Sequence, residues 1–194
     1  MKQLGILFFI TFCLCGCASK HFNDTEAGKL SGKLKVQWLK PDQFLFIPDK
    51  DDPLTFHRSS GESISPGAMY TDGGSIPRPL WAFRNYSPWG YAPAFIVHDW
   101  LFEMKHCGLP GSANYDVFIA GQVMSEIIKT LMQQHPDIEE NKFVMYSMYE
   151  AVTSKIAQKL WLEGGCKQPI MKAFTGDGKA PLVPLMEYTI EFPK

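Results

Sequence analysis

The sequence predicts an α+β domain in which a small antiparallel sheet packs against a layer of three helices. Residues 35–58 contain short runs of β-favouring residues between turn-forming residues. From residue 91 to residue 160, apolar residues recur at the spacing of a helix face. Near the C-terminus, residues 186–192 alternate strictly between apolar and polar side chains, as a half-buried strand does.

The strands lie mainly in the first part of the chain. The pairs Pro41-Asp42 and Pro48-Asp49 supply turns between the first β-favouring runs. We expect one antiparallel sheet, and its strands are 35–39, 44–47, 54–58 and 186–192.

The helices fill the second half of the chain. The first is expected over residues 91–105, with Pro93 near its start, where a missing N–H costs little. Ser112 is expected to cap a second helix that runs to Gln134. The third follows Pro136-Asp137 and stops at Gly164-Gly165.

The N-terminus has the pattern of a secretion signal. A short basic start is followed by the apolar run 4–14, which is shorter than the roughly 20 residues that span a bilayer. The next residues, Leu14-Cys15-Gly16-Cys17, resemble the lipobox of bacterial lipoproteins. The resemblance implies cleavage before Cys17 and acylation of that residue, and several acyl chains give stable anchoring. A buried N-terminal helix is the alternative.

This interpretation divides the chain into a signal peptide (1–16), a lipidated tether (17–29) and one domain (30–194). The tether is expected because its residues are mostly polar. Ala18 follows the Cys, which by resemblance favours the outer membrane, so we expect the protein at its periplasmic face. The formal net charge of −1 gives no basic excess, so nucleic acid is not an expected partner. The pattern leaves the oligomeric state open.

Two cysteines remain beyond the signal region, Cys107 and Cys166. An even pair in an oxidising compartment suggests a disulfide. Three helices that alternate in direction would place the ends of the first and the third at one pole, which brings these cysteines together. Two unrelated thiols are the alternative.

Two motifs carry the residues that could do chemistry. They are Thr71-Asp72-Gly73-Gly74-Ser75-Ile76-Pro77 and His98-Asp99-Trp100-Leu101-Phe102. Together they resemble an uncharacterised family of bacterial and phage proteins, over roughly residues 50–160. The resemblance implies no activity, so the chemistry has to come from the residues.

His98 shares a helix face with Leu101 and Phe102, and Asp116 shares a face with Ile119 and Val123, so both are expected to point inward. Two antiparallel helices can bring His98 and Asp116 together. A carboxylate that accepts one imidazole N–H leaves the other nitrogen free to take a proton from water. The pair is therefore a hypothetical catalytic base and its orienting group.

Asp99 lies about 100° further round the helix and cannot share the face of His98. It is expected to bind calcium, with Asp72, Gly73 and Gly74 completing an oxygen shell. The arrangement resembles secreted phospholipases of the A2 type, in which a His activates water, the adjacent Asp binds calcium and a second-helix Asp orients the His. The match is incomplete: Phe102 stands where those enzymes often have Tyr, and their flanking Cys is absent.

The function expected from these residues is a membrane-anchored lipoprotein that hydrolyses lipid or ester bonds with calcium. Two alternatives remain open. Ser75 could act as a nucleophile with His98 as its base and Asp116 or Asp72 as the orienting group. The polar residues could instead form a satisfied structural cluster. In that case the protein is a non-catalytic envelope lipoprotein with a binding, structural or phage-exclusion role.

Overall fold

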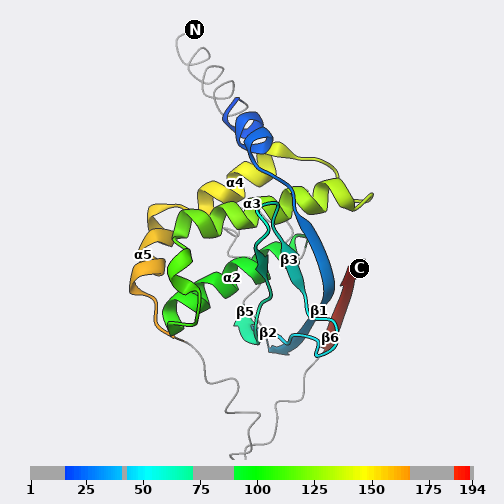
Figure 1. Ribbon diagram of the computed structural model, residues 1–194, viewed down its shortest axis with the longest axis vertical. Coiled ribbons are helices and arrows are strands. Elements are labelled where there is room, and N and C mark those ends of the chain that lie inside the picture. The colour runs from blue at the N-terminus through cyan, green and yellow to red at the C-terminus, as the bar shows by residue number, and fades with distance from the viewer. Residues whose placement is uncertain (1–15, 41–42, 72–89, 167–185, 193–194) are drawn as a thin grey trace, which may run out of the picture.

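The computed structural model of the protein describes residues 16–40, 43–71, 90–166 and 186–192. It confirms the predicted α+β class: a curled antiparallel sheet stands on one side, and the helices pack together on the other (Figure 1). A helix formed by residues 16–24 projects from the helical side.

The sheet is built around one long strand. The strands are β1 (Lys29–Lys40), β2 (Gln43–Phe46), β3 (Thr55–His57), β4 (Ser63–Ile64), β5 (Met69–Thr71) and β6 (Met186–Phe192). Their order is β4-β3-β1-β2-β5, and β6 pairs with β1. All of these pairings are antiparallel, and β6 runs along β1 from Gly32↔Phe192 to Trp38↔Met186. The predicted C-terminal strand is therefore confirmed, and its partner is the first strand of the chain.

Strand β1 separates core from solvent by simple alternation. Leu34 and Val36 are 2% and 1% exposed and belong to the core. On the opposite face, the Nζ atoms of Lys33 and Lys35 lie 3.1 and 3.0 Å from the carboxylates of Glu191 and Glu187 on β6. These pairs are partly exposed, so they fix the pairing of β1 with β6 more than they stabilise the fold.

Gly32 explains why the first half of β1 was not predicted as strand. Its φ is +85°, and a Cβ there would lie 2.1 Å from the carbonyl oxygen of Pro53. The chain uses this close approach for a hydrogen bond, in which the N–H of Lys33 donates to the carbonyl of Asp52 at 2.8 Å. A glycine inside a strand weakens the strand pattern, and here it marks a contact with another backbone segment.

The helical layer contains four helices among the described residues where three were predicted. They are α2 (Ala92–Cys107), α3 (Val117–Gln134), α4 (Lys142–Val152) and α5 (Lys155–Glu163), with a short 3₁₀ turn, η2 (Ser112–Asn114), before α3. The predicted third helix is broken because Ser154 caps α5, its hydroxyl accepting from the N–H of Ala157. Thr153 ends α4 beside it and donates its hydroxyl to the carbonyl of Tyr149.

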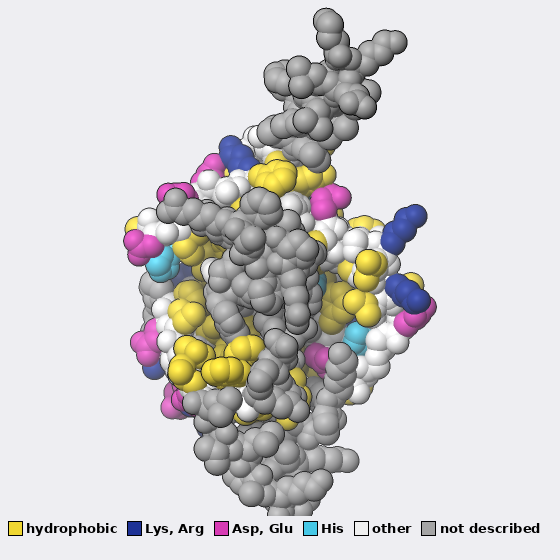
Figure 2. Space-filling model, turned by 180° about the vertical axis from the view of Figure 1, so that it is seen from behind, with side chains coloured by type: hydrophobic (Ala, Val, Ile, Leu, Met, Phe, Trp, Pro, Cys, Tyr) yellow, Lys and Arg dark blue, Asp and Glu magenta, His cyan; other side chains and the backbone are white. Residues whose placement is uncertain are grey.

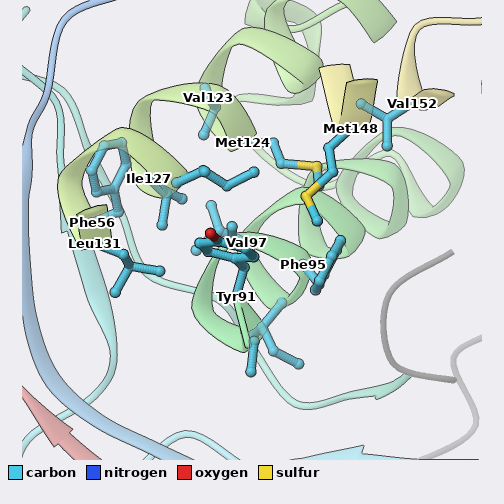
Figure 3. Packing of buried hydrophobic residues seen from close by; sticks show 14 of the residues in the cluster. Phe56, Tyr91, Phe95, Val97, Val123, Met124, Ile127, Leu131, Met148 and Val152 are labelled. Carbon is cyan, nitrogen blue, oxygen red and sulfur yellow. The ribbon is translucent and has the colours of Figure 1, made fainter. Parts of the chain in front are cut away.

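The core lies where α2 meets α3 and the sheet. Figure 3 shows Val97 of α2, Ile127 of α3 and Phe56 of β3 converging on the same space. Every residue from Ala92 to His98 is buried, so the first half of α2 has no solvent-facing side. A helix enclosed all round places a polar residue such as His98 inside the domain whatever its face.

The first part of the segment expected to be a lipidated tether is helical and packed on the domain. Residues 16–24 are helical, and Ala18, Phe22 and Thr25 are 3%, 4% and 2% exposed. The Nζ of Lys129 on α3 donates to the carbonyls of Phe22 and Thr25 at 2.8 and 2.7 Å, which satisfies the end of the helix. The spacing of the three buried residues is that of one helix face, and the polar composition of the segment obscured it. Searched over the described residues, the helices include none with the length and hydropathy of a membrane span.

His21 fastens this helix to α3 and α4 and makes its docking sensitive to pH. Its Nε2 lies 3.0 Å from the hydroxyl of Ser125, and its ring centroid lies 4.4 Å from that of Tyr149. Burial lowers the pKa of His21 below its ordinary 6.5, although Glu150 and Asp24 act in the opposite direction. The neutral ring is thus favoured in the folded protein. Its contribution to stability is complete above the unfolded pKa and is lost as the pH falls through the folded one.

We therefore expect the melting temperature of the wild-type protein to fall more steeply than that of His21→Gln as the pH is lowered from 7 to 5. The other titrating groups are common to both proteins and cancel in the difference. Thermal unfolding across this pH range measures the effect, and parallel curves for the two proteins would show that His21 does not titrate in docking.

Candidate functional site

The candidate site is centred on His98, which α2 holds inside the domain. The residue is 7% exposed. Its Nδ1 lies 3.5 Å from Oδ1 of Asp99, and within the described part of the chain its buried Nε2 has no hydrogen-bond partner. A buried polar atom without a partner is uncommon and usually has a functional or structural reason.

Asp99 connects His98 to the sheet. Its Oδ2 accepts a hydrogen bond of 3.0 Å from the hydroxyl of Thr71, which is buried at the end of β5. One carboxylate thus faces a hydroxyl with one oxygen and the imidazole with the other. A carboxylate beside Nδ1 favours the tautomer that carries its proton on Nδ1, which leaves Nε2 as the basic nitrogen.

Aromatic rings cover the other side of His98. The centroid of Phe102 lies 5.0 Å from that of His98, and Trp161 of α5 meets Phe102 edge-on at 4.7 Å. Trp161 is 5% exposed. Phe102, on the same helix, therefore covers His98, and Trp161 of α5 packs on the other side of Phe102. The contact with Trp161 was not foreseen because it joins residues about sixty positions apart.

The predicted pair of His98 and Asp116 is wrong. Asp116 is exposed at the N-cap of α3, where its Oδ1 accepts from the N–H of Ile119 at 2.7 Å. Asp is among the strongest N-cap residues because its side chain satisfies an N–H that the helix leaves free. This local role turns the carboxylate away from the core. Asp99, expected to face elsewhere, is the carboxylate beside His98.

The predicted calcium ligands can be followed only in part. Asp72, Gly73 and Gly74 lie outside the described residues, as does Ser75. The oxygens of Asp99 face Thr71 and His98. Across residues 16–40, 43–71, 90–166 and 186–192, no three His, Cys, Asp or Glu side chains gather to hold a metal ion.

The predicted disulfide is confirmed. Cys107 and Cys166 are bonded, with their Cα atoms 4.6 Å apart, so the alternative of two unrelated thiols is wrong. The bond joins the end of α2 to the residues that follow α5, and it thereby holds α5 against the helix that carries His98. Cys17, the predicted acylation site, is exposed and unbonded.

A second polar cluster, missed from the sequence, locks α3 to the loop after β3. Arg58 makes two hydrogen bonds of 2.8 Å to the carboxylate of Glu126 and one of 2.8 Å to Glu62, which also accepts from the hydroxyl of Tyr115. The hydrogen bond to Glu126 raises the pKa of Arg58. Burial pushes the pKa of Glu62 upward, but the hydrogen bonds from Tyr115 and Arg58 outweigh it, and the pKa falls. The cluster could have been found from Glu126, because a charged residue on the apolar face of a predicted helix needs a buried partner.

Residues 51–152, more than half of the chain, match a family described as a protein of unknown function (DUF1353). The chain belongs to this family. The DUF1353 match runs from before β3 to the end of α4, so it includes Thr71, His98 and Asp99. It leaves out helix 16–24, α5 and β6. Comparisons with curated proteins and with solved structures gave no match.

Proposed function

We propose that the protein is an envelope lipoprotein, acylated at Cys17 and held at the periplasmic face of the outer membrane, that hydrolyses lipid or other ester bonds with His98 as the general base. The lipobox resemblance and the exposed, unbonded state of Cys17 support the anchoring. One observation carries the chemistry: Nε2 of His98 is buried without a partner among the described residues, while Nδ1 faces a carboxylate.

An unpartnered buried polar atom costs about 1–3 kcal/mol of folding free energy. A purely architectural histidine would be expected to use both ring nitrogens, because buried polar groups are normally satisfied. Here Asp99, which accepts a hydrogen bond from Thr71, lies 3.5 Å from one ring nitrogen, and the other nitrogen has no partner among the described residues, which is the arrangement a base requires.

In the proposed reaction, Nε2 of His98 removes a proton from a water molecule as its oxygen attacks the ester carbonyl carbon. Asp99 stabilises the imidazolium that forms. The tetrahedral intermediate collapses with cleavage of the carbon–oxygen bond to the leaving alcohol, and the imidazolium returns its proton to that oxygen. The products are a carboxylic acid and an alcohol, and the base is restored.

Calcium at Asp99 remains part of the proposal as an accessory ion. Asp99 is the only one of the predicted ligands that the structure describes, and its oxygens already face Thr71 and His98. The described residues alone therefore do not make a calcium site, and the ion would need the oxygens of Asp72, Gly73 and Gly74. No step of the proposed reaction depends on it.

The test compares fatty-acid release from phospholipid vesicles by the wild type, His98→Gln, Asp99→Asn and Asp116→Asn. We expect His98→Gln to lose about 100-fold or more, the usual contribution of a general base, and Asp99→Asn to lose activity because the imidazole is no longer oriented. Asp116→Asn keeps an N-cap residue and is expected to retain wild-type activity. Full activity in His98→Gln would refute the base.

The same proteins test calcium. A calcium-dependent rise in melting temperature that is lost in Asp99→Asn would support calcium binding at Asp99. No rise in the wild type would refute calcium binding and would not affect the proposed role of His98 as the base.

The enclosure of His98 by Phe102 favours a second function, a non-catalytic envelope lipoprotein with a binding, structural or phage-exclusion role. In that case the motif joins α2 to β5 and serves the architecture. Absence of ester hydrolysis by the wild type, together with strong destabilisation of His98→Gln, would support this function over the first.

A further inference from the structure

We infer that α5 and the start of α3 form a lipid-facing flank, consisting of Phe118, Ile156, Leu160 and Leu162, which rests on the membrane that holds Cys17. The inference builds on the proposed acylation of Cys17 and adds the surface by which the domain meets the bilayer.

The flank is apolar and strongly exposed. Ile156, Leu160 and Leu162 of α5 are 75%, 58% and 77% exposed. Lys155 and Lys159 are exposed beside them, and Lys159 pairs with Glu163 at 3.7 Å. Figure 2 shows hydrophobic side chains beside charged ones at the edge that α5 forms, on the right of that view. A short helix with outward apolar side chains and lysines is suited to the interface of a bilayer that contains anionic lipids.

Only one side of α5 is used by the fold. Trp161 is 5% exposed and packs edge-on against Phe102, whereas the residues before and after it, Leu160 and Leu162, face outward. Exposed leucines and isoleucines in such a group are not needed for packing, and grouped apolar exposure marks an interaction surface.

The flank is connected to the anchor through α3 and α4. Cys17 lies in a pocket of about 280 Å³ with Gln122 of α3 and Tyr146 of α4 among its lining residues. Phe118, 49% exposed, precedes Gln122 by one turn of α3 and therefore lies on the same side of that helix. From Tyr146, α4 runs away from helix 16–24 to α5 at the edge of the molecule (Figure 1).

The anchor is also rigid, so the orientation of the flank is fixed. Phe22 and Thr25 are buried, and Lys129 binds their carbonyls. A flexible tether would let any face of the domain meet the membrane. A docked helix that begins at the acylated residue allows a narrow range of orientations, and the flank, with its lysines and apolar side chains, is the described face suited to lipid.

If the flank rests on the membrane, the substrate class of the proposed site is a membrane lipid. The inner side of α5 holds Trp161, which covers Phe102 and through it His98. A lipid surface in contact with α5 would therefore lie against the element that covers the base.

The experiment uses residues 17–194, the mature chain of the proposed lipoprotein, with Cys17→Ser, so that neither the apolar run 4–14 nor acyl chains contribute to binding. Vesicles of phosphatidylethanolamine and phosphatidylglycerol are sedimented with this parent and with the same chain carrying Ile156→Gln, Leu160→Gln and Leu162→Gln. We expect the partition coefficient of the triple variant to fall about tenfold or more, since three apolar side chains are lost from the interface. Its melting temperature should stay within about 2 °C, because exposed substitutions cost little.

A matched control carries Met186→Thr, Tyr188→Thr and Ile190→Thr on β6, which remove three other apolar side chains that are 49%, 46% and 42% exposed. This control should bind vesicles like the parent. Equal binding by the α5 variant, equal loss in the control, or no binding by the parent would each overturn the inference. So would self-association of the parent that the α5 substitutions abolish without vesicles, because the occupant would then be a second copy of the chain.

Mass spectrometry of the wild-type chain tests the proposed anchoring separately. An unmodified Cys17 would refute the proposal that the protein is a lipoprotein. The vesicle experiment would still decide whether the flank binds lipid.

Discussion

Replacing Glu126 by Ala is expected to lower the free energy of unfolding by about 3 kcal/mol, the lower end of the range for removing one partner of a buried ion pair. The side chains of Arg58 and Glu126 are 16% and 8% exposed and are joined by two hydrogen bonds of 2.8 Å. Without Glu126, the guanidinium keeps Glu62 but loses both of these bonds in a place that water reaches poorly. Urea unfolding of the two proteins measures the difference.

Glu163→Ala supplies the control for this measurement. Glu163 pairs with Lys159 at 3.7 Å on α5, and both side chains are more than 60% exposed. Its loss is expected to cost less than about 0.5 kcal/mol. Adding Arg58→Met to Glu126→Ala should recover part of the lost stability, because the buried guanidinium is no longer left without Glu126, and the more exposed Glu62 keeps the hydrogen bond from Tyr115. A cost below about 1 kcal/mol for Glu126→Ala would show that the pair acts like a surface ion pair.

The sequence predicted those parts of the fold whose pattern is local. The strand at 186–192 and the helix over 91–105 were found from local pattern, although the alternation of β6 does not match its burial, because residues 186–191 are all exposed. The break between α4 and α5 was missed, although Ser154 is a good N-cap, because the apolar spacing continues across it. The docking of helix 16–24 was missed because three buried residues on one face are a weak signal within a polar segment.

The sequence predicted the position of His98 but not the residues that surround it. The inward position of His98 follows from the apolar residues around it on α2. Its printed contacts, Asp99 and Phe102, lie on the same helix. The residues that position these two depend on long-range packing, since Thr71 comes from β5 and Trp161 comes from α5. Helix faces alone made Asp116 an attractive partner, but at the first residue of a helix the unsatisfied N–H groups compete for the carboxylate, and that competition decided its position.

Removing the disulfide by Cys107→Ser and Cys166→Ser is expected to lower the free energy of unfolding by about 4 kcal/mol, because the bond closes a loop with a separation of 59 residues and restricts the unfolded chain. Cys17→Ser is the matched control, since Cys17 is exposed and unbonded, and it should leave the stability unchanged. Chemical denaturation of the three proteins gives the comparison. Equal stability of the double variant and the wild type would mean that the bond does not constrain the unfolded state.

Removing the disulfide should lower local stability most in α5. This helix has an apolar outer surface, and its described attachments to the layer below include the buried Trp161 and the bond from Cys166 to the end of α2. Without the bond, α5 keeps Trp161 but gains freedom to move away from Phe102. Hydrogen exchange should therefore rise in α5 before it rises in α3, whose buried face is part of the main core. Equal acceleration of hydrogen exchange in both helices would instead indicate that the disulfide stabilises the domain as a whole and does not specifically hold α5 against Phe102.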